Sequence, residues 1–252
     1  MNDNGMKKQK VKVAVLVLIA IVGMVYHVNA KQIMATANEL TKKEQNIIAI
    51  SSLTGKGDLD KLKIALNTGL EEGLTINEIK EVLVHTYAYC GFPRSIRALQ
   101  SFMEVVDDRK ASGKVDETGD EASPIDQNVN KYTRGKKILE ELTKTQQPES
   151  LSGYSAFAPT IDRFLKEHLF AAIFERDVLN YAERELVTIS VIASIGKAEP
   201  MLRSHLIICR NVGLSSEKLQ EFVTVLKSTI GKKEAKVAQQ VLDEVLANDK
   251  IN

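Results

Sequence analysis

The sequence predicts an all-α protein that contains two copies of one helical unit. Apolar residues recur at helical spacing through most of the chain, and no run of period-two alternation is long enough to indicate a β-sheet. The segment EQNIIAISSLTGKG from Glu44 matches ERELVTISVIASIG from Glu183, and GLTINEIKEVL from Gly73 matches GLSSEKLQEFV from Gly213. A repeat of about 65 residues indicates the duplication of a helical unit rather than a solenoid array.

The N-terminus has the layout of a secretory signal peptide. Four lysines between positions 7 and 12 precede an apolar run over 13–26, and Val28-Asn29-Ala30 forms a small-residue cleavage site. That run is shorter than the roughly 20 apolar residues that span a bilayer. We therefore expect residues 1–30 to be removed and the protein to be exported, to the periplasm in a bacterium. An uncleaved membrane anchor is the alternative.

Charge, cysteine content and motifs limit the possible partners. Removal of residues 1–30 takes away four lysines and Asp3, so the net charge changes from +1 to −2. This balance indicates neither nucleic acid nor, after cleavage, a membrane surface as a partner. Two cysteines are too few for a disulfide framework, and their pairing stays open. No phosphate-binding loop, metal-ligand spacing or nucleophile elbow occurs, so we expect no metal, no cofactor and a small-molecule substrate.

The first unit, residues 40–106, has clear helix signals. Thr75 and Glu78 form a capping box. Gly91 is predicted to end the helix that follows, and Pro93 to prevent its resumption nearby. The stripe that should meet the core comprises Ile79, Val82, Leu83 and Thr86.

Residues 107–177 separate the two units. The stretch 108–130 is rich in charge, glycine and serine and indicates a mobile linker. Helices are predicted over 132–143 and 162–174, with a loop over 145–159. The apolar side of the second helix is predicted to comprise Phe164, Leu165, His168, Leu169 and Ile173. This segment either covers a site as a lid or packs between the units, and we favour packing. The second unit, 178–247, repeats the pattern of the first.

The helix before Gly91 carries four chemically useful side chains. Glu81, His85 and Tyr89 lie four residues apart and share one face, while Cys90 projects toward the apolar side. Glu81 is placed to fix the tautomer of His85, whose imidazole titrates near neutral pH. The alternative interpretation is the polar face of an ordinary surface helix.

Three patterns together resemble the carboxymuconolactone decarboxylase family, which shares its fold with alkylhydroperoxidase D-like proteins. They are Glu81-x3-His85-x3-Tyr89-x-Gly91-x-Pro93, the lead-in Gly73-Leu74-Thr75, and Arg184-Glu185-Leu186. The resemblance covers about residues 40–106 and 178–247. It implies an all-helical domain that assembles into homo-oligomers, trimers or hexamers, with sites between subunits or repeats.

The resemblance implies that the peroxidase branch of this fold carries a Glu followed by CxxCxxxH on the next helix. In the second unit Glu185 fits the carboxylate and His205 fits the histidine, but Ala198 and Met201 stand at the cysteine positions. A dithiol peroxidase needs an attacking and a resolving thiol, and this pattern has neither. A peroxidase that uses Cys90 alone, and borrows its resolving thiol, stays an alternative.

The two units differ from the pattern in complementary ways. In the first unit Asn46 replaces the upstream carboxylate, and the histidine position falls near Ala65 or Leu66. In the second unit Val225 and Thr229 stand where the first unit has its histidine and tyrosine. One hypothesis is therefore a composite site that takes half of its residues from each unit.

Decarboxylation of a lactone acid needs proton donors and an anchor for a carboxylate. Histidine and tyrosine suit the proton roles, and an arginine binds both carboxylate oxygens. Arg94 and Arg97 follow the Gly-Phe-Pro break, and Arg94 is the favoured anchor. We expect a cofactor-free acid/base enzyme for a small lactone or carboxylate. An exported, non-catalytic oligomeric binding protein is the competing class.

Overall fold

A computed structural model describes residues 38–126 and 128–248 of the 252-residue chain. The chain divides into two compact units, residues 1–39 and 40–252, and all helices with described bounds lie in the second. The predicted signal peptide lies outside the described residues. Within them the backbone is helical or irregular without any strand, which confirms the all-α prediction, and no helix there is long and apolar enough to cross a bilayer.

The two predicted copies have the same order of helices. The first copy comprises α2 (Lys42–Lys56), α3 (Leu59–Glu71) and α4 (Ile76–Ala111). The second comprises α8 (Tyr181–Ile195), α9 (Glu199–Asn211), α10 (Ser216–Thr229) and α11 (Lys232–Asn248). The backbone of α4 is broken at Gly91, so its two halves correspond to α10 and α11. Gly231, which separates α10 from α11, also has a positive φ.

Equivalent residues start the helices of both copies. Capping boxes begin α2 at Thr41 and α8 at Asn180, each closed by a glutamate three residues later. Thr75 begins α4 with the predicted capping box, whereas Ser215 caps α10 without one because Lys218 replaces the glutamate. Each box satisfies two backbone N–H groups that have no acceptor within the helix.

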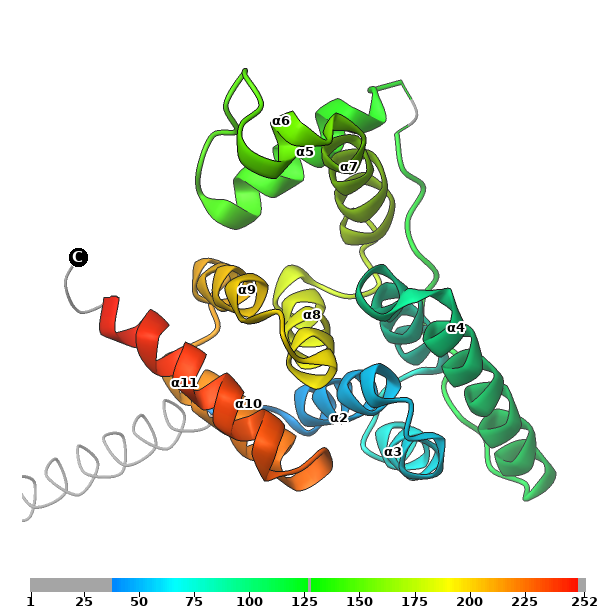
Figure 1. Ribbon diagram of the computed structural model, residues 1–252. Helices are drawn as coiled ribbons and strands as arrows, with labels where there is room; N and C mark the ends of the chain where they lie inside the picture. Colours follow the sequence, from blue (N-terminus) through cyan, green and yellow to red (C-terminus); the bar gives the residue numbers. More distant parts are fainter. Residues whose placement is uncertain (1–37, 127, 249–252) are drawn as a thin grey trace, which may run out of the picture. The chain divides into compact units, whose positions relative to one another are not determined.

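Each copy packs helices against the first helix of the other copy. The most extensive contact between them joins α2 to α8, while α4 packs on α8 and α10 packs on α2 (Figure 1). At Gly55 the two central helices approach so closely that an added Cβ would lie 2.0 Å from Ser194 Oγ. The predicted stripe on α4 is wholly buried, and the core also includes Ile47, Ile48, Ile50, Leu186, Val187 and Ile189.

The break in α4 differs in one respect from the prediction. Gly91 interrupts the helix with φ 78° and ψ 162°, but the helix resumes at once. Pro93 lies in the first turn of the resumed half, where a missing N–H costs no hydrogen bond. Ser95 Oγ then donates to Leu83 O at 2.7 Å and ties the two halves together.

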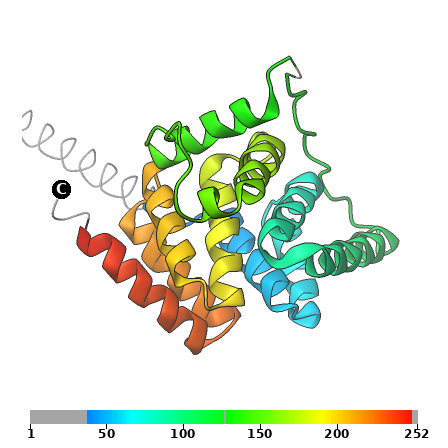
Figure 2. The ribbon, with the colours of Figure 1, turned by 45° about the horizontal axis from the view of Figure 1, so that its top comes forward.

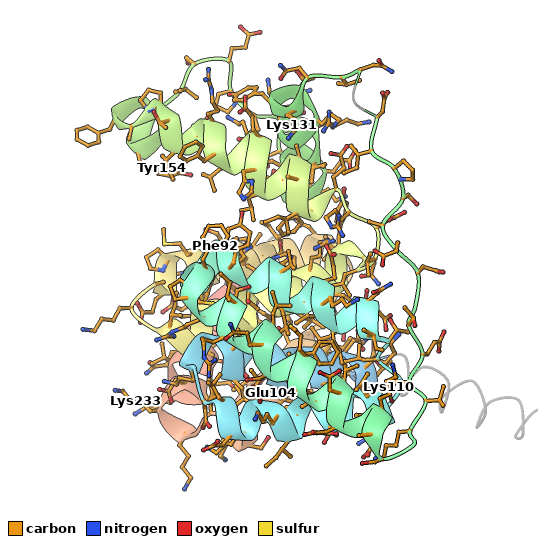
Figure 3. All side chains as sticks on the ribbon, turned by 90° about the vertical axis from the view of Figure 1, so that its right-hand side faces the viewer. Phe92, Glu104, Lys110, Lys131, Tyr154 and Lys233 are labelled. Atoms are coloured by element: carbon orange, nitrogen blue, oxygen red, sulfur yellow. The ribbon has the colours of Figure 1, made fainter. Side chains whose placement is uncertain are left out.

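The inserted segment forms a separate layer of helices (Figure 2). It comprises α5 (Lys131–Thr143), α6 (Gly153–Phe157), α7 (Pro159–Phe164) and the π-helix η1 (Leu165–Phe174). Figure 3 shows Lys131 and Tyr154 on this layer and Phe92, just after the break in α4, on the side that faces it. The buried positions 166, 169, 170, 173 and 174 recur at ordinary helical spacing, but this face is rotated by about one residue from the predicted one. Phe164 and His168 are exposed, contrary to the prediction, whereas Phe170 and Phe174 are buried.

The linker after α4 is held against the start of that helix, so the prediction of a mobile linker is wrong for its first part. Its first residues belong to α4, which continues to Ala111. The backbone N–H groups of Ile76 and Asn77 donate to Glu117 O and Thr118 O, both at 2.9 Å. These carbonyls satisfy N–H groups of the first helical turn, which the sequence pattern alone did not reveal.

We predict that Gly135→Ala lowers the free energy of unfolding by about 1–3 kcal/mol, because overpacking against backbone cannot be relieved by a rotamer change. A Cβ at Gly135 would lie 1.7 Å from Lys166 O, where α5 crosses η1. Gly69→Ala is the matched control, since its Cβ would meet only flexible side chains, at 3.2 Å or more. Urea unfolding of both variants measures the difference, and equal losses would contradict the explanation.

Candidate functional site

The face of α4 that carries Glu81 and His85 is buried, so the surface-helix interpretation is wrong. Glu81 is 4% exposed and His85 is fully buried. The second copy's α8 covers this face, and Phe174, at the end of η1, packs its ring edge-on against His85 at 5.0 Å. The inserted segment thus contributes its last turn to the cover of the site.

Glu81 binds two arginines from outside its own helix. Its carboxylate accepts from Arg184 Nη2 at 2.8 Å and from Arg176 Nε and Nη2, both at 2.9 Å. Arg184 is wholly buried and also donates to the backbone carbonyl of Arg176. The contact that the spacing suggested between Glu81 and His85 is therefore replaced by one that Arg184 makes with both.

Both ring nitrogens of His85 have partners from α8. Nδ1 lies 3.1 Å from Arg184 Nη1, and Nε2 lies 3.0 Å from Thr188 Oγ1. A guanidinium only donates, so Nδ1 must accept and the ring proton must sit on Nε2. Burial, and then the neighbouring charge of Arg184, hold the pKa of His85 well below its usual value. His85 is therefore a neutral imidazole with one defined tautomer.

Tyr89 connects this cluster to a second histidine. Its hydroxyl lies 3.2 Å from Thr188 Oγ1, and its ring stacks on His85 with centroids 5.7 Å apart. The same ring meets His205 edge-on at 5.9 Å. Burial, and then the charge of Glu185, raise the pKa of Tyr89. The phenol consequently keeps its proton at neutral pH.

Glu185 and His205, on α8 and α9, form a directly bonded pair. His205 Nδ1 lies 2.8 Å from Glu185 Oε2, as in the carboxylate–imidazole pairs that orient a catalytic histidine. Glu185 is fully buried, and its other oxygen, Oε1, has no hydrogen-bond partner among the described residues. The pairing leaves Nε2 of His205 as the nitrogen for exchange with a ligand.

A cavity of about 530 Å³ opens beside Tyr89, lined by Lys56, Tyr89, Cys90, Arg94, Ser194 and Ile195. Its lining combines a phenol, a thiol and two cationic side chains. Lys56 bonds to Glu234 at 2.6 Å, whereas Arg94 has no ion-pair partner in the part of the chain that is described. Such a lining suits an anionic small molecule.

Four of the predicted site residues do not line this cavity: Glu81, His85, Glu185 and His205. Tyr89 alone among the predicted acid/base residues belongs to both the lining and the buried cluster. A larger hollow of about 600 Å³ lies at the start of α4, next to Thr75, Glu78 and Asp177, and none of the predicted site residues lines it. The chemistry therefore favours the smaller cavity.

Cys90 has the environment of a protonated thiol. Its Sγ donates to Thr86 O at 3.1 Å, and burial raises the pKa of its thiol. A peroxidase needs a thiolate, which a lowered pKa would favour. Cys209 is fully buried, and both cysteines are free thiols.

The duplication would place a second, equivalent cluster between α10 and α2, and one of its contacts is retained. Glu221 corresponds to Glu81 and accepts from Gln45 Nε2 at 2.9 Å, as Glu81 accepts from Arg184. The remaining equivalents of Thr188, His85, Tyr89, Glu185 and His205 are Ala49, Val225, Thr229, Asn46 and Ala65. The complementary losses in the two copies therefore remove one cluster and leave the other complete.

Comparison with known proteins agrees with this duplicated architecture. A model of the carboxymuconolactone decarboxylase family matches residues 26–103 and 159–244. The chain belongs to that family.

Two relatives show how far the likeness within the carboxymuconolactone decarboxylase family extends. A 4-carboxymuconolactone decarboxylase of Acinetobacter baylyi is 27% identical over 128 residues, which are 48% of this chain and 95% of the relative. An uncharacterized protein of Methanocaldococcus jannaschii is 28% identical over 81 residues, which are 32% of this chain and 76% of the relative. Both matches are shorter than the duplicated chain.

The residues that contact this cluster or line the cavity, but were not singled out as site residues from the sequence, include Lys56, Arg176, Arg184 and Thr188. Arg184 was noted only as part of a family motif. Thr188 lies one turn after it on the same face of α8, and both differ from their equivalents Gln45 and Ala49. A comparison of the two copies at these positions could have marked Arg184 and Thr188 as candidates from the sequence. Arg176 follows the π-helix, and nothing in the repeat pattern marks it.

We predict that Glu81→Gln lowers the free energy of unfolding by about 3 kcal/mol or more, because it leaves a wholly buried guanidinium without its carboxylate. Glu221→Gln is the matched control, since the equivalent partner Gln45 is uncharged and only neutral-donor hydrogen bonds, worth about 1 kcal/mol each, are altered. Guanidinium chloride unfolding measures both variants. Equal losses would contradict a special role for the buried arginine.

Protonation of His85 should make stability fall in mild acid. Its pKa is lower in the folded than in the unfolded chain, so below about pH 6.5 only the unfolded chain takes up the proton. The free energy of unfolding should then fall by up to about 1.4 kcal/mol per pH unit from this group. In His85→Gln that part of the slope should vanish. Parallel stability curves for the two proteins between about pH 5 and 8 would contradict it.

Proposed function

We propose that the protein is a cofactor-free acid/base enzyme that acts on a small lactone or carboxylate in the cavity beside Tyr89. One observation carries the proposal: the Tyr89 side chain belongs both to the wall of that cavity and to the polar cluster between the copies. An anion held by Arg94 would therefore lie next to proton-carrying groups. The relative named 4-carboxymuconolactone decarboxylase supports this substrate class.

In such a decarboxylation the bond between the substrate carbon and its carboxylate breaks and CO2 leaves. The electron pair remains on the carbon as an enolate, which must then accept a proton. Tyr89, protonated at neutral pH, donates a hydrogen bond to the enolate oxygen. His205, oriented by Glu185, does not line the cavity, so we propose that it transfers the proton through a water molecule. Arg94 and Lys56 bind the substrate's remaining negative charge.

Thiol peroxidase activity is the second candidate, because Cys90 lines the same cavity as Arg94. Its raised pKa and its hydrogen bond to Thr86 O make it a poor thiolate, so acid/base chemistry is preferred. A non-catalytic binding protein would use the same cavity without turnover.

We also propose that the protein is exported and forms homo-oligomers. Export rests on the signal pattern of residues 1–30. An interface with a second copy is supported by a stripe of exposed apolar side chains on the second half of α4, at Phe92, Ile96 and Met103.

The test of function is CO2 release from 4-carboxymuconolactone and related lactone acids by the purified protein. We expect His205→Gln to lower kcat about 100-fold or more, as for loss of an acid/base group. Arg94→Leu should raise KM about tenfold, since a charge-assisted bond to the carboxylate is lost. Arg97→Leu is its matched control, because Arg97 is exposed, bonds to Gln100 alone among the described residues and lies outside the cavity lining.

Cys90→Ser should leave this decarboxylation unchanged. Consumption of a hydroperoxide with a thiol reductant that disappears in Cys90→Ser would instead establish the peroxidase and overturn the proposal. Binding of the lactone acid that depends on Arg94 but gives no turnover would identify a binding protein.

A further inference from the structure

A row of hydrogen-bonded side chains leads from the buried interior to the cavity. Arg184 Nη1 lies 3.1 Å from His85 Nδ1, His85 Nε2 lies 3.0 Å from Thr188 Oγ1, and Thr188 Oγ1 lies 3.2 Å from the Tyr89 hydroxyl. The row alternates between α8 and α4, so it crosses the boundary between the copies. Each step ends on a side chain that makes the next hydrogen bond of the row.

We propose that Arg184 and Thr188 are positioning residues for Tyr89: they fix the direction of the row so that Tyr89 presents its hydroxyl hydrogen to a ligand in the cavity. This inference deepens the proposed function and rests on it for the role of Tyr89. The direction begins at Arg184, whose guanidinium has donors and no acceptor.

The donor at Arg184 determines the direction of the bonds as far as Thr188. His85 Nδ1 must accept from it, so Nε2 carries the hydrogen and donates to Thr188 Oγ1. The Thr188 hydroxyl has a single hydrogen, and in the proposed row this hydrogen is shared between two acceptors, the Arg184 carbonyl at 3.0 Å and the Tyr89 oxygen at 3.2 Å. A bond received by the tyrosine oxygen leaves the phenol hydrogen for the ligand. It also steadies negative charge on that oxygen when the hydrogen is shared.

The second copy provides an internal comparison. At its equivalent interface all four members of the row are replaced: Gln45 for Arg184, Ala49 for Thr188, Val225 for His85 and Thr229 for Tyr89. The joint replacement of all four is what we expect if they act as one hydrogen-bonded unit, because the loss of one member interrupts the row for the others.

The comparison also argues against a purely structural role for Arg184. If the arginine served only to pair the glutamate of the facing helix, its equivalent would need a charge as well. Glu221 is nevertheless satisfied by the neutral Gln45 and by Leu40 N, at 2.9 and 2.7 Å. The fold therefore accepts glutamine in this place. What the second copy lacks is the histidine, and with it any need for a further donor.

The first experiment reads the tautomer of His85 by nitrogen-15 NMR, and it uses Arg184→Gln. Gln45 donates its two amide hydrogens to Glu221 and Leu40 O, so a glutamine at 184 should likewise leave His85 Nδ1 without a donor. The wild type should show a single Nε2–H imidazole between about pH 5 and 8. The variant should show a population with the hydrogen on Nδ1. A variant that keeps the wild-type tautomer overturns the role of Arg184.

The second experiment is a double-mutant cycle on turnover with Thr188→Val and Tyr89→Phe. Thr188→Val should lower kcat about tenfold or more with little change in KM, as expected for a group that supports a hydrogen-bond donor in the transition state. In the Tyr89→Phe background it should have no further effect. Ser190→Ala is the matched control, because within the described part of the chain its buried hydroxyl on α8 bonds to Leu186 O alone. Additive losses overturn the role of Thr188.

The two experiments separate the inference from the proposed function. The NMR result requires no substrate, so a directed row in a protein that releases no CO2 contradicts the function alone. Turnover that survives Thr188→Val and Arg184→Gln unchanged contradicts the row alone. If Arg184→Gln fails to fold, Thr188→Val still decides whether Tyr89 depends on the row.

Discussion

The guanidinium of Arg184 is a positive charge wholly removed from water, and much of the site follows from the need to satisfy it. A buried charge is tolerated only where a counter-charge and enough acceptors surround it. Here the acceptors are the Glu81 carboxylate, the His85 ring and the backbone carbonyl of Arg176. They come from α4 and from the turn after η1. One side chain therefore joins both copies and the inserted segment.

This constraint also sets the chemical state of the histidine beside it. A cation 3.1 Å from Nδ1 opposes a second positive charge on the ring, and burial acts in the same direction. His85 is thus unsuited to take up a proton from a substrate near neutral pH. In the proposed mechanism proton transfer is instead assigned to His205, which faces a carboxylate and retains 15% exposure of its side chain. In this proposal His85 keeps one tautomer and relays a hydrogen bond, whereas His205 transfers protons.

The elements predictable from the sequence were those with a local cause. The capping box at Thr75, the break at Gly91 and the buried stripe of α4 all follow from neighbouring residues. The buried face of η1 was misplaced by about one residue, so that His168 is exposed and Phe174 is buried, because it is set by packing against α5 and His85, which no local pattern specifies. The resumption of α4 at Pro93 was missed because proline was taken as a stop rather than as a first-turn residue.

The site was predictable in its membership but not in its connections. Glu81, His85 and Tyr89 could be grouped by spacing, and Glu185 with His205 by resemblance. That the two groups meet depends on α4 packing against α8, which is a contact between copies about 100 residues apart. No local pattern encodes it. The same holds for Lys56, which reaches the cavity only because α2 ends beside α8.

Duplication explains why a composite site can persist while each copy by itself is incomplete. In a pair of identical units, each interface would take its acid/base helix from one unit and its arginine helix from the other. Loss of one interface would then remove residues from both units at once and leave the complementary half of each, which is the pattern at Gln45, Ala49, Val225 and Thr229. The retained Glu221 to Gln45 bond shows that the helices of the lost interface still need to pack. The α10–α2 interface therefore keeps its packing without the polar cluster, whereas the α4–α8 interface keeps both, with Arg184 bonded to Glu81 and His85.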